Sequence, residues 1–431
     1  MSLRQNAFVL LLLTALLSIS GDWAESPELA HLWRLPAALL LLGLGYELYL
    51  VQRAQLRLEI RTRALWYLTR PTALLFEVSH RLARELQIEI APQPPAGLEC
   101  SRAVRSLLVG SATAELALSG VADRLGEHSW PAQRARIAGP LGLAWWPQRL
   151  PVSVVSRVMP DIGSAATAAS AVLRGGARAG AHAGAGAELL QLREFRPGDP
   201  LRLVDWKASA RRGALISRDF AEDQHLDIVL AVDCGRSSGI RCGDLDRLGH
   251  YVNLAARFAA HAVARDDRVG LVAYGDRPLA ALSPARGQGA VRRIHTLLGA
   301  LTLQPTDSNP LHAAMRIRAL VRHRCLVLLL TDVADAWSGS QLVQATQLLT
   351  PQHVPMVVGL RSDEREAFAR ATDGDWLDPY RALAAEEDRL RAARSVRALN
   401  ARGVLGLVSR PELLERAVFD AYEGFRRARR V

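Results

Sequence analysis

Two strongly apolar segments that each end in aspartate constrain this sequence most. One reads LDIVLAVD and ends at Asp233, and the other reads CLVLLLTD and ends at Asp332. Continuous apolar runs of this length are typical of strands buried on both faces of a parallel sheet. Because parallel strands end at the same edge of a sheet, the two carboxylates are predicted to lie close together there. Like charges at such range are costly unless a metal ion, a proton or a cationic group joins them.

The sequence from residue 226 onward alternates strand-like and helix-like segments. Strands are predicted over 226–233, 268–274, 278–282, 325–331, 354–360 and 404–408. Helices are predicted over 244–265, 289–301, 309–322, 339–349, 378–399 and 411–428. This alternation predicts an α/β fold with a doubly wound, mostly parallel sheet.

The N-terminal part contains two apolar runs, 7–19 and 35–51. The second is long enough to span a bilayer, whereas the first is either the core of a signal peptide or one half of a helix hairpin. We favour a retained transmembrane hairpin over 1–52, in which Glu47 must pair or reach the interface. Arginines follow the second run, so the positive-inside rule predicts a bacterial inner (cytoplasmic) membrane protein whose soluble domains face the cytoplasm.

The middle of the chain divides by composition. Short alternating runs over 53–160 predict a small β-sandwich-like domain. An Ala/Gly-rich stretch over 161–187 is typical of a linker, with a helical part as an alternative. The signature block, defined as residues 188–225, is expected to pack on the next domain, which covers 226–431.

The charge pattern argues against nucleic-acid binding. The net charge is +11, but the basic residues are scattered and are arginines except for Lys207, as in proteins from GC-rich bacterial genomes. No basic stripe interleaved with aromatic residues is present. The four cysteines lack the spacing of a zinc site. No phosphate loop ending in GK[ST] occurs, so the chain is not expected to hydrolyse ATP.

The signature block contains the densest polar pattern, REFRPGDPLRLVDWKASARRGALISRDF. Its candidate functional residues are Arg196, Gly198, Asp199, Asp205, Trp206, Lys207, Arg211 and Arg218. One interpretation is an ion-paired scaffold in which Trp206 is a packing anchor on the following domain. The other is a contact surface for an acidic partner or a nucleotide. We favour the scaffold, because charge networks more often hold structure than mark a binding site.

This signature, followed by VLAVDCGRSS and later by LLLTDVAD, resembles the bacterial DUF58 family, whose function is unknown. The resemblance extends to the N-terminal hairpin and the β-rich segment. It implies a domain like those of von Willebrand factor A type. It also implies a membrane-anchored accessory or adaptor protein associated with a MoxR-type AAA+ ATPase.

Domains of von Willebrand A type hold a divalent cation, usually Mg²⁺, through an Asp-x-Ser-x-Ser loop, a threonine and a second aspartate. The resemblance assigns these roles to Asp233, Ser237, Thr306 or Ser308, and Asp332. Gly235 stands where the loop has its middle serine, which removes one hydroxyl ligand. Mg²⁺ keeps several waters and needs few protein ligands, so occupied and empty sites are both open at this point.

The sequence therefore favours an adaptor that is not an enzyme and has no evident small-molecule substrate. A partner carboxylate would complete the coordination of a shared Mg²⁺ at Asp233, Ser237 and Asp332. The alternative is a metal-dependent hydrolase that uses the Asp233/Asp332 crevice to activate water. A positioned base beside the two aspartates would distinguish it, and no histidine or glutamate is evidently supplied by the adjoining loops. A third interpretation is a purely structural membrane protein.

Overall fold

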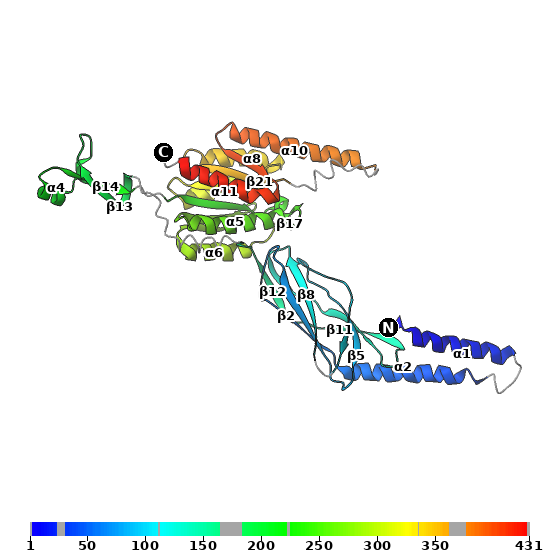
Figure 1. The fold of residues 1–431 in the computed structure, drawn as a ribbon. Helices are drawn as coiled ribbons and strands as arrows, with labels where there is room; N and C mark the ends of the chain where they lie inside the picture. The colour runs from blue at the N-terminus through cyan, green and yellow to red at the C-terminus, as the bar shows by residue number, and fades with distance from the viewer. Residues whose placement is uncertain are drawn as a thin grey trace. The chain divides into compact units, whose positions relative to one another are not determined.

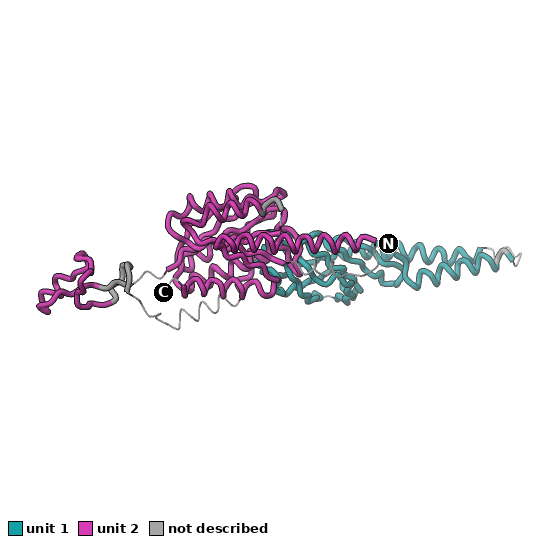
Figure 2. The backbone as a smooth tube through the Cα atoms, turned by 90° about the horizontal axis from the view of Figure 1, so that it is seen from above, with its two compact units in different colours: residues 1–159 teal, residues 160–431 magenta. Residues whose placement is uncertain are grey.

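The structure is a computed structural model, and it describes residues 2–23, 31–110, 113–163, 183–221, 225–334, 336–361 and 376–428. The chain separates into two compact units, residues 1–159 and 160–431 (Figure 2). Each unit is described by itself below.

Unit 1 begins with a pair of helices, α1 (Gln5–Trp23) and α2 (Arg34–Ala54), which pack side by side (Figure 1). Helix α2 is long and apolar enough to cross a membrane, and α1 has a shorter apolar stretch, Gln5–Ser20. Many of their apolar side chains are exposed, including Leu12 at 63% and Leu42 at 75%. Both apolar runs found in the sequence are therefore helical.

The rest of unit 1 is built from strands, as its alternating sequence predicts. They are β1 (Ser2–Leu3), β2 (Arg57–Thr62), β3 (Leu65–Tyr67), β4 (Thr72–Ser79), β5 (Leu86–Ala91), β6 (Leu98–Cys100), β7 (Arg105–Val109), β8 (Ala114–Ala122), β9 (Gly126–Ser129), β10 (Gln133–Ala138), β11 (Ala144–Leu150) and β12 (Val155–Met159). They form three sheets, in the orders β1-β11-β10-β5-β7, β2-β4-β8-β6 and β3-β12-β9. We call residues 57–159 the β-domain. Its core contains Trp66, Phe76 and Trp130, and the last two rings meet edge to face.

A buried carboxylate joins α2 to the β-domain. Glu47 is fully buried, and its Oε1 accepts hydrogen bonds from the backbone N–H groups of Leu141 and Leu143. Its Oε2 accepts from Ala144 N and from the indole Nε1 of Trp146. Glu47 therefore pairs inside the protein, which is one of the two outcomes that the sequence required of it.

The signature block forms an antiparallel pair of strands, β13 (Ala183–Glu194) and β14 (Ile216–Ala221), with η2 (Leu201–Leu203) and α4 (Trp206–Arg212) between them. Because β13 starts at Ala183, the last five residues assigned to the linker, 183–187, are instead part of a strand. The cause is pairing with β14, which the small side chains of AGAGA do not reveal in the sequence. The linker's remainder and its suggested helical part fall largely on residues 164–182, which lie outside the described residues.

The second unit is dominated by a six-stranded sheet. Its strands are β15 (Asp227–Asp233), β18 (Arg268–Tyr274), β19 (Pro278–Ala285), β20 (Leu326–Leu330), β21 (Val354–Leu360) and β22 (Leu405–Ser409). The order is β19-β18-β15-β20-β21-β22, and every pairing is parallel except that of β18 with β19. This confirms the predicted mostly parallel α/β sheet. Near β15 lie the short elements η3 (Arg236–Gly239), β16 (Arg241–Cys242) and β17 (Leu245–Asp246).

Helices lie on both sides of this sheet. They are α5 (Arg247–Val263), α6 (Gly287–Gly299), α7 (Pro310–Leu320), α8 (Ala336–Leu349), α10 (Asp378–Asn400) and α11 (Pro411–Ala428). Helices α5, α6 and α11 form one contacting set, while α7, α8 and α10 form another (Figure 1). Alternate strand residues such as Val229 and Ala231 face the core that α7 and α8 complete. Burial on both faces explains why these strands read as unbroken apolar runs.

Candidate functional site at the sheet edge

The two aspartates predicted to meet do lie at the same edge of the sheet. Asp233 ends β15, and Asp332 follows β20 by two residues; these strands are parallel neighbours, with Val232 opposite Leu330. The chain leaves β15 toward β18 on one side and later returns as β20 on the other. This is the topological switch point, where open α/β sheets form crevices. Asp233 is 1% exposed and Asp332 is 5% exposed.

Three neutral donors surround Asp233. Its Oδ1 accepts from Gly235 N at 2.8 Å and from Ser308 Oγ at 2.6 Å, and its Oδ2 accepts from Thr331 Oγ1 at 2.6 Å. Burial raises the pKa of Asp233 above its ordinary value; the three hydrogen bonds oppose this shift, and the nearby negative charge of Asp332 adds to it.

Asp332 is paired with a cationic side chain. Its Oδ2 accepts from Nη1 of Arg247, and its Oδ1 accepts from Ala334 N at 2.9 Å. Arg247 stands in the first turn of α5, is 2% exposed, and also lies 3.5 Å from the carbonyl oxygen of Ser237. Burial lowers the pKa of Arg247, whereas several neighbouring groups raise it, Asp332 the most, and the net shift is upward. The guanidinium therefore stays charged.

A loop covers the start of η3 and closes one side of the crevice. Gln304 N donates to the carbonyl of Cys234 at 2.7 Å, and Arg236 N donates to the carbonyl of Thr306 at 2.9 Å. At the rim, Arg236 and Asp307 form an exposed ion pair. The loop thereby brings Ser308 into contact with Asp233.

The residues predicted to bind a metal ion occupy different positions and make different contacts. Ser308 reaches Asp233, whereas Thr306 is exposed and contributes its backbone carbonyl to the loop. Ser237 contributes its carbonyl oxygen to the surroundings of Arg247. Sequence reasoning missed Thr331 and Arg247. Thr331 directly precedes Asp332 and alternation could have placed it, but nothing in the sequence marks Arg247 among 53 other basic residues.

As arranged, these groups do not fit Mg²⁺. Asp332 already carries a guanidinium, and both oxygens of Asp233 accept hydrogen bonds from hydroxyl groups. Within the described ranges, no cluster of three or more His, Cys, Asp or Glu side chains is arranged to hold a metal ion. Occupancy by Mg²⁺ stays a prediction of the resemblance, and the donor geometry argues against it.

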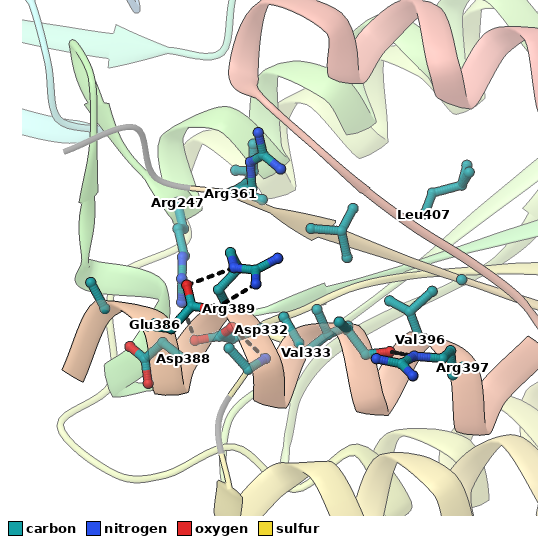
Figure 3. A pocket seen from close by; sticks show the side chains of 17 residues that line it. Arg247, Asp332, Val333, Arg361, Glu386, Asp388, Arg389, Val396, Arg397 and Leu407 are labelled. Atoms are coloured by element: carbon teal, nitrogen blue, oxygen red, sulfur yellow. Dashed lines mark hydrogen bonds and ion pairs between the residues drawn. The ribbon is translucent and has the colours of Figure 1, made fainter. Parts of the chain in front are cut away.

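A cavity of about 530 Å³ adjoins the crevice, between α10, the end of β21 and the middle of β22. Figure 3 shows Arg247 and Asp332 lining it together with the Glu386–Arg389 ion pair of α10. Most of the remaining lining is apolar and includes Val396 and Leu407. The Nε of Arg247 is buried and has no hydrogen-bond partner among the described residues.

Some of the charged side chains of the signature block pair with one another. Gly198 has φ +107°, in the region that favours glycine, so the predicted turn does require it. In that turn Asp199 accepts from Arg193 Nη1 at 2.7 Å, from Arg193 Nη2 at 2.9 Å and from Arg196 N at 2.9 Å. These bonds, with Arg193 the largest cause, lower the pKa of Asp199 to about 2.

In the second half of the signature block, helix α4 is capped and several of its side chains are exposed. Asp205 caps α4 by accepting from Ala208 N at 2.9 Å, and its Oδ2 lies 3.8 Å from Arg218 Nε. Trp206 is 64% exposed, and Lys207 and Arg211 are exposed as well. Trp206 begins a short helix held by its cap and by β14, and neither covers the indole. Its role as a packing anchor on the following domain stays a prediction.

Comparisons with known proteins give little beyond a family. No curated protein matches the sequence. Among solved structures, one similar chain is the CARDB domain of a Pyrococcus furiosus protein in complex with di-metal ions. The sequence identity is 8%, the match covers 25% of this chain and 90% of the CARDB chain, and the TM-score is 0.18. Another is a protein of unknown function from Porphyromonas gingivalis W83, with 15% identity, coverage of 25% and 48%, and a TM-score of 0.19.

Similarity at these TM-scores carries no argument about fold or function, and this chain spans about half the length of the second protein. The family comparison is more informative. It covers residues 191–369, a range that contains most of the signature block, both aspartates and the β21 strand. This range matches the family model described as "Protein of unknown function DUF58", and the match supports membership of the DUF58 family.

Proposed function

We propose that this chain is a membrane-anchored adaptor that binds a protein partner through its α/β unit and its signature block. The apolar α2 helix supports the anchor, and the arginines that follow it favour the cytoplasmic side of a bacterial inner membrane. The strand order and the aspartates at the switch point agree with the resemblance to domains of von Willebrand A type. Such a domain would serve recognition instead of catalysis.

The observation that carries this proposal is the exposure of Trp206. The side chain of Trp206 is 64% exposed and stands beside the exposed Lys207 and Arg211, on a short helix whose N-terminus Asp205 caps. Tryptophan and arginine are the residue types that most often dominate the binding energy of protein interfaces. The cationic neighbours favour an acidic partner surface.

The partner that we propose is a MoxR-type AAA+ ATPase acting in the assembly or maturation of another complex. This choice rests on the family resemblance. It agrees with the sequence, because the chain has no phosphate loop of its own and an ATP-driven step would have to come from the partner.

A capture experiment with the full-length protein tests the proposal. The protein would be solubilised in detergent, immobilised through a C-terminal tag and incubated with a purified MoxR-type AAA+ ATPase from the same organism. Trp206→Ala is expected to reduce capture by tenfold or more, in line with the loss of about 2 kcal/mol at an interface hot spot. Trp376→Ala is the matched control, since Trp376 is also exposed, at 75%, but lies outside the signature block.

Capture that is equal for the wild type, Trp206→Ala and Lys207→Glu would overturn the proposed binding surface. No capture by the wild type would overturn the choice of partner. Comparison of the proteins retained by wild type and Trp206→Ala from the same membranes would then show whether the surface binds another protein.

No described contact favours the metal-dependent hydrolase. The thiol beside Asp233 belongs to Cys234, which is buried, and burial raises its pKa to about 12, far from a reactive thiolate. The ring of His250, on α5, bonds the carbonyl oxygen of Cys242 through Nε2 at 2.7 Å. The adaptor is therefore the function that we retain.

A further inference from the structure

The unusual feature of the crevice is a buried arginine at the place where two aspartates converge. We propose that the Arg247 guanidinium permanently supplies the positive charge that Asp332 requires, so that the crevice works without a divalent cation. This inference concerns the chemistry of the crevice and does not depend on the adaptor proposal.

The charge arrangement supports this proposal first. Arg247 is 2% exposed and bonds Asp332, so the guanidinium and this carboxylate neutralise each other inside the protein. A divalent ion that bound Asp332 would displace the guanidinium and leave it buried without its partner. Breaking a buried pair in this way is strongly unfavourable, because the remaining charge has lost both water and counter-ion.

The geometry of the loop after β15 is a second, independent argument. Gly235 has φ −72°, a value that any residue adopts, so glycine is not required there by the backbone angle. It is required by space: a Cβ atom at this position would lie 2.3 Å from Ser308 Oγ and 2.9 Å from Ser308 N. A serine that offered a hydroxyl ligand from position 235 would therefore clash with Ser308.

The hydroxyl groups near Asp233 are also committed. Ser308 and Thr331 each donate to a different oxygen of this carboxylate at 2.6 Å, and Gly235 N donates to Oδ1. These donors satisfy Asp233 without any cation. Arg247 satisfies Asp332, so each acid already has a partner within the fold.

The decisive experiment is a metal titration of the full-length protein in detergent. Mn²⁺ would be titrated and its bound fraction followed by electron paramagnetic resonance, while thermal unfolding is recorded with EDTA and with millimolar Mg²⁺. The wild type is expected to bind no stoichiometric Mn²⁺ at this crevice and to unfold at the same temperature in both buffers.

Arg247→Ala is expected to reverse this behaviour. Its unfolding midpoint in EDTA falls below that of the wild type, and Mg²⁺ or Mn²⁺ recovers part of the loss because the freed Asp332 can bind it. Arg257→Ala is the matched control: Arg257 lies on the same helix and pairs with Asp161 and Glu415, away from both aspartates. It is expected to lower the midpoint without creating any dependence on Mg²⁺.

Two results would overturn the inference. The first is one equivalent of Mn²⁺ on the wild type that is lost in Asp332→Asn. The second is a wild-type midpoint that falls on chelation. If Arg247→Ala does not fold, Arg247→Lys takes its place, because it keeps the charge and is expected to remain insensitive to Mg²⁺; the wild-type titration decides the question in either case.

Discussion

The carboxylate of Glu47 is the most sharply testable element of unit 1. Each of its oxygens serves two donors, Leu141 N and Leu143 N on one side and Ala144 N and Trp146 Nε1 on the other. Glu47→Gln keeps the shape but replaces one oxygen with an NH₂ group. Whichever way the amide turns, that group faces two N–H donors and can accept from neither.

The expected loss follows from this count. A buried donor left without an acceptor costs about 1–3 kcal/mol, so two such donors with some local relaxation should cost about 3 kcal/mol. For a unit of this size, such a loss lowers the unfolding midpoint by roughly 6–12 °C. The matched control is Glu127→Gln, because that side chain is 62% exposed in a surface ion pair with Arg157 and its removal should cost about 0.5 kcal/mol or less.

Tryptophan fluorescence is a suitable assay for this unit. Six of the nine tryptophans of the chain lie in it: Trp23, Trp33, Trp66, Trp130, Trp145 and Trp146. Thermal or denaturant unfolding of the detergent-solubilised full chain would therefore report mainly on unit 1. Equal stabilities for Glu47→Gln and Glu127→Gln would refute the reasoning, since they would mean that water or other acceptors satisfy the four donors.

Three further predictions concern unit 2. Burial raises the pKa of Asp233, so ionisation of this carboxyl group opposes folding once the pH rises above the ordinary pKa of 3.8. Asp233→Asn is therefore expected to be at least as stable as the wild type at about pH 8. The difference in stability should vanish below pH 3.8, which unfolding at several pH values would measure. Gly235→Ala places a methyl group against Ser308 and should cost about 1–3 kcal/mol in denaturant unfolding, part of which a second change, Ser308→Gly, recovers. Arg193→Ala should return the pKa of Asp199 from about 2 toward 3.8, measured by NMR titration, so the stabilisation that the wild type loses as the pH falls through this window is absent from the variant.

Much of the α/β sheet could be predicted because its strands are buried on both faces. The predicted strand 354–360 has the bounds of β21. The predicted 226–233 differs from β15 by one residue at its start, and 325–331 differs from β20 by one residue at each end. The same reasoning placed Asp233 and Asp332 at one edge, since parallel neighbours share a direction. These conclusions depend only on local hydrophobicity and chain direction, which a single sequence contains.

The partners of those aspartates could not be predicted in the same way. Arg247 pairs with Asp332 across 85 residues of sequence, and its pairing depends on how α5 packs on the sheet. The exposure of Trp206 could not be predicted for a related reason. An aromatic residue in a conspicuous motif suggests a buried anchor, whereas the cap at Asp205 holds the short helix without covering the indole.

The four hydrogen bonds to Glu47 have a mechanical consequence. They fasten the middle of α2 to the turn before β11, while β1, at the start of α1, pairs with β11 itself. Two separate attachments to one strand and its turn resist both rotation and tilt, so the helices and the β-domain should move as one rigid lever. In a bilayer, the tilt of the two helices would then set the direction in which the β-domain points. A change in bilayer thickness that alters this tilt would therefore also turn the β-domain.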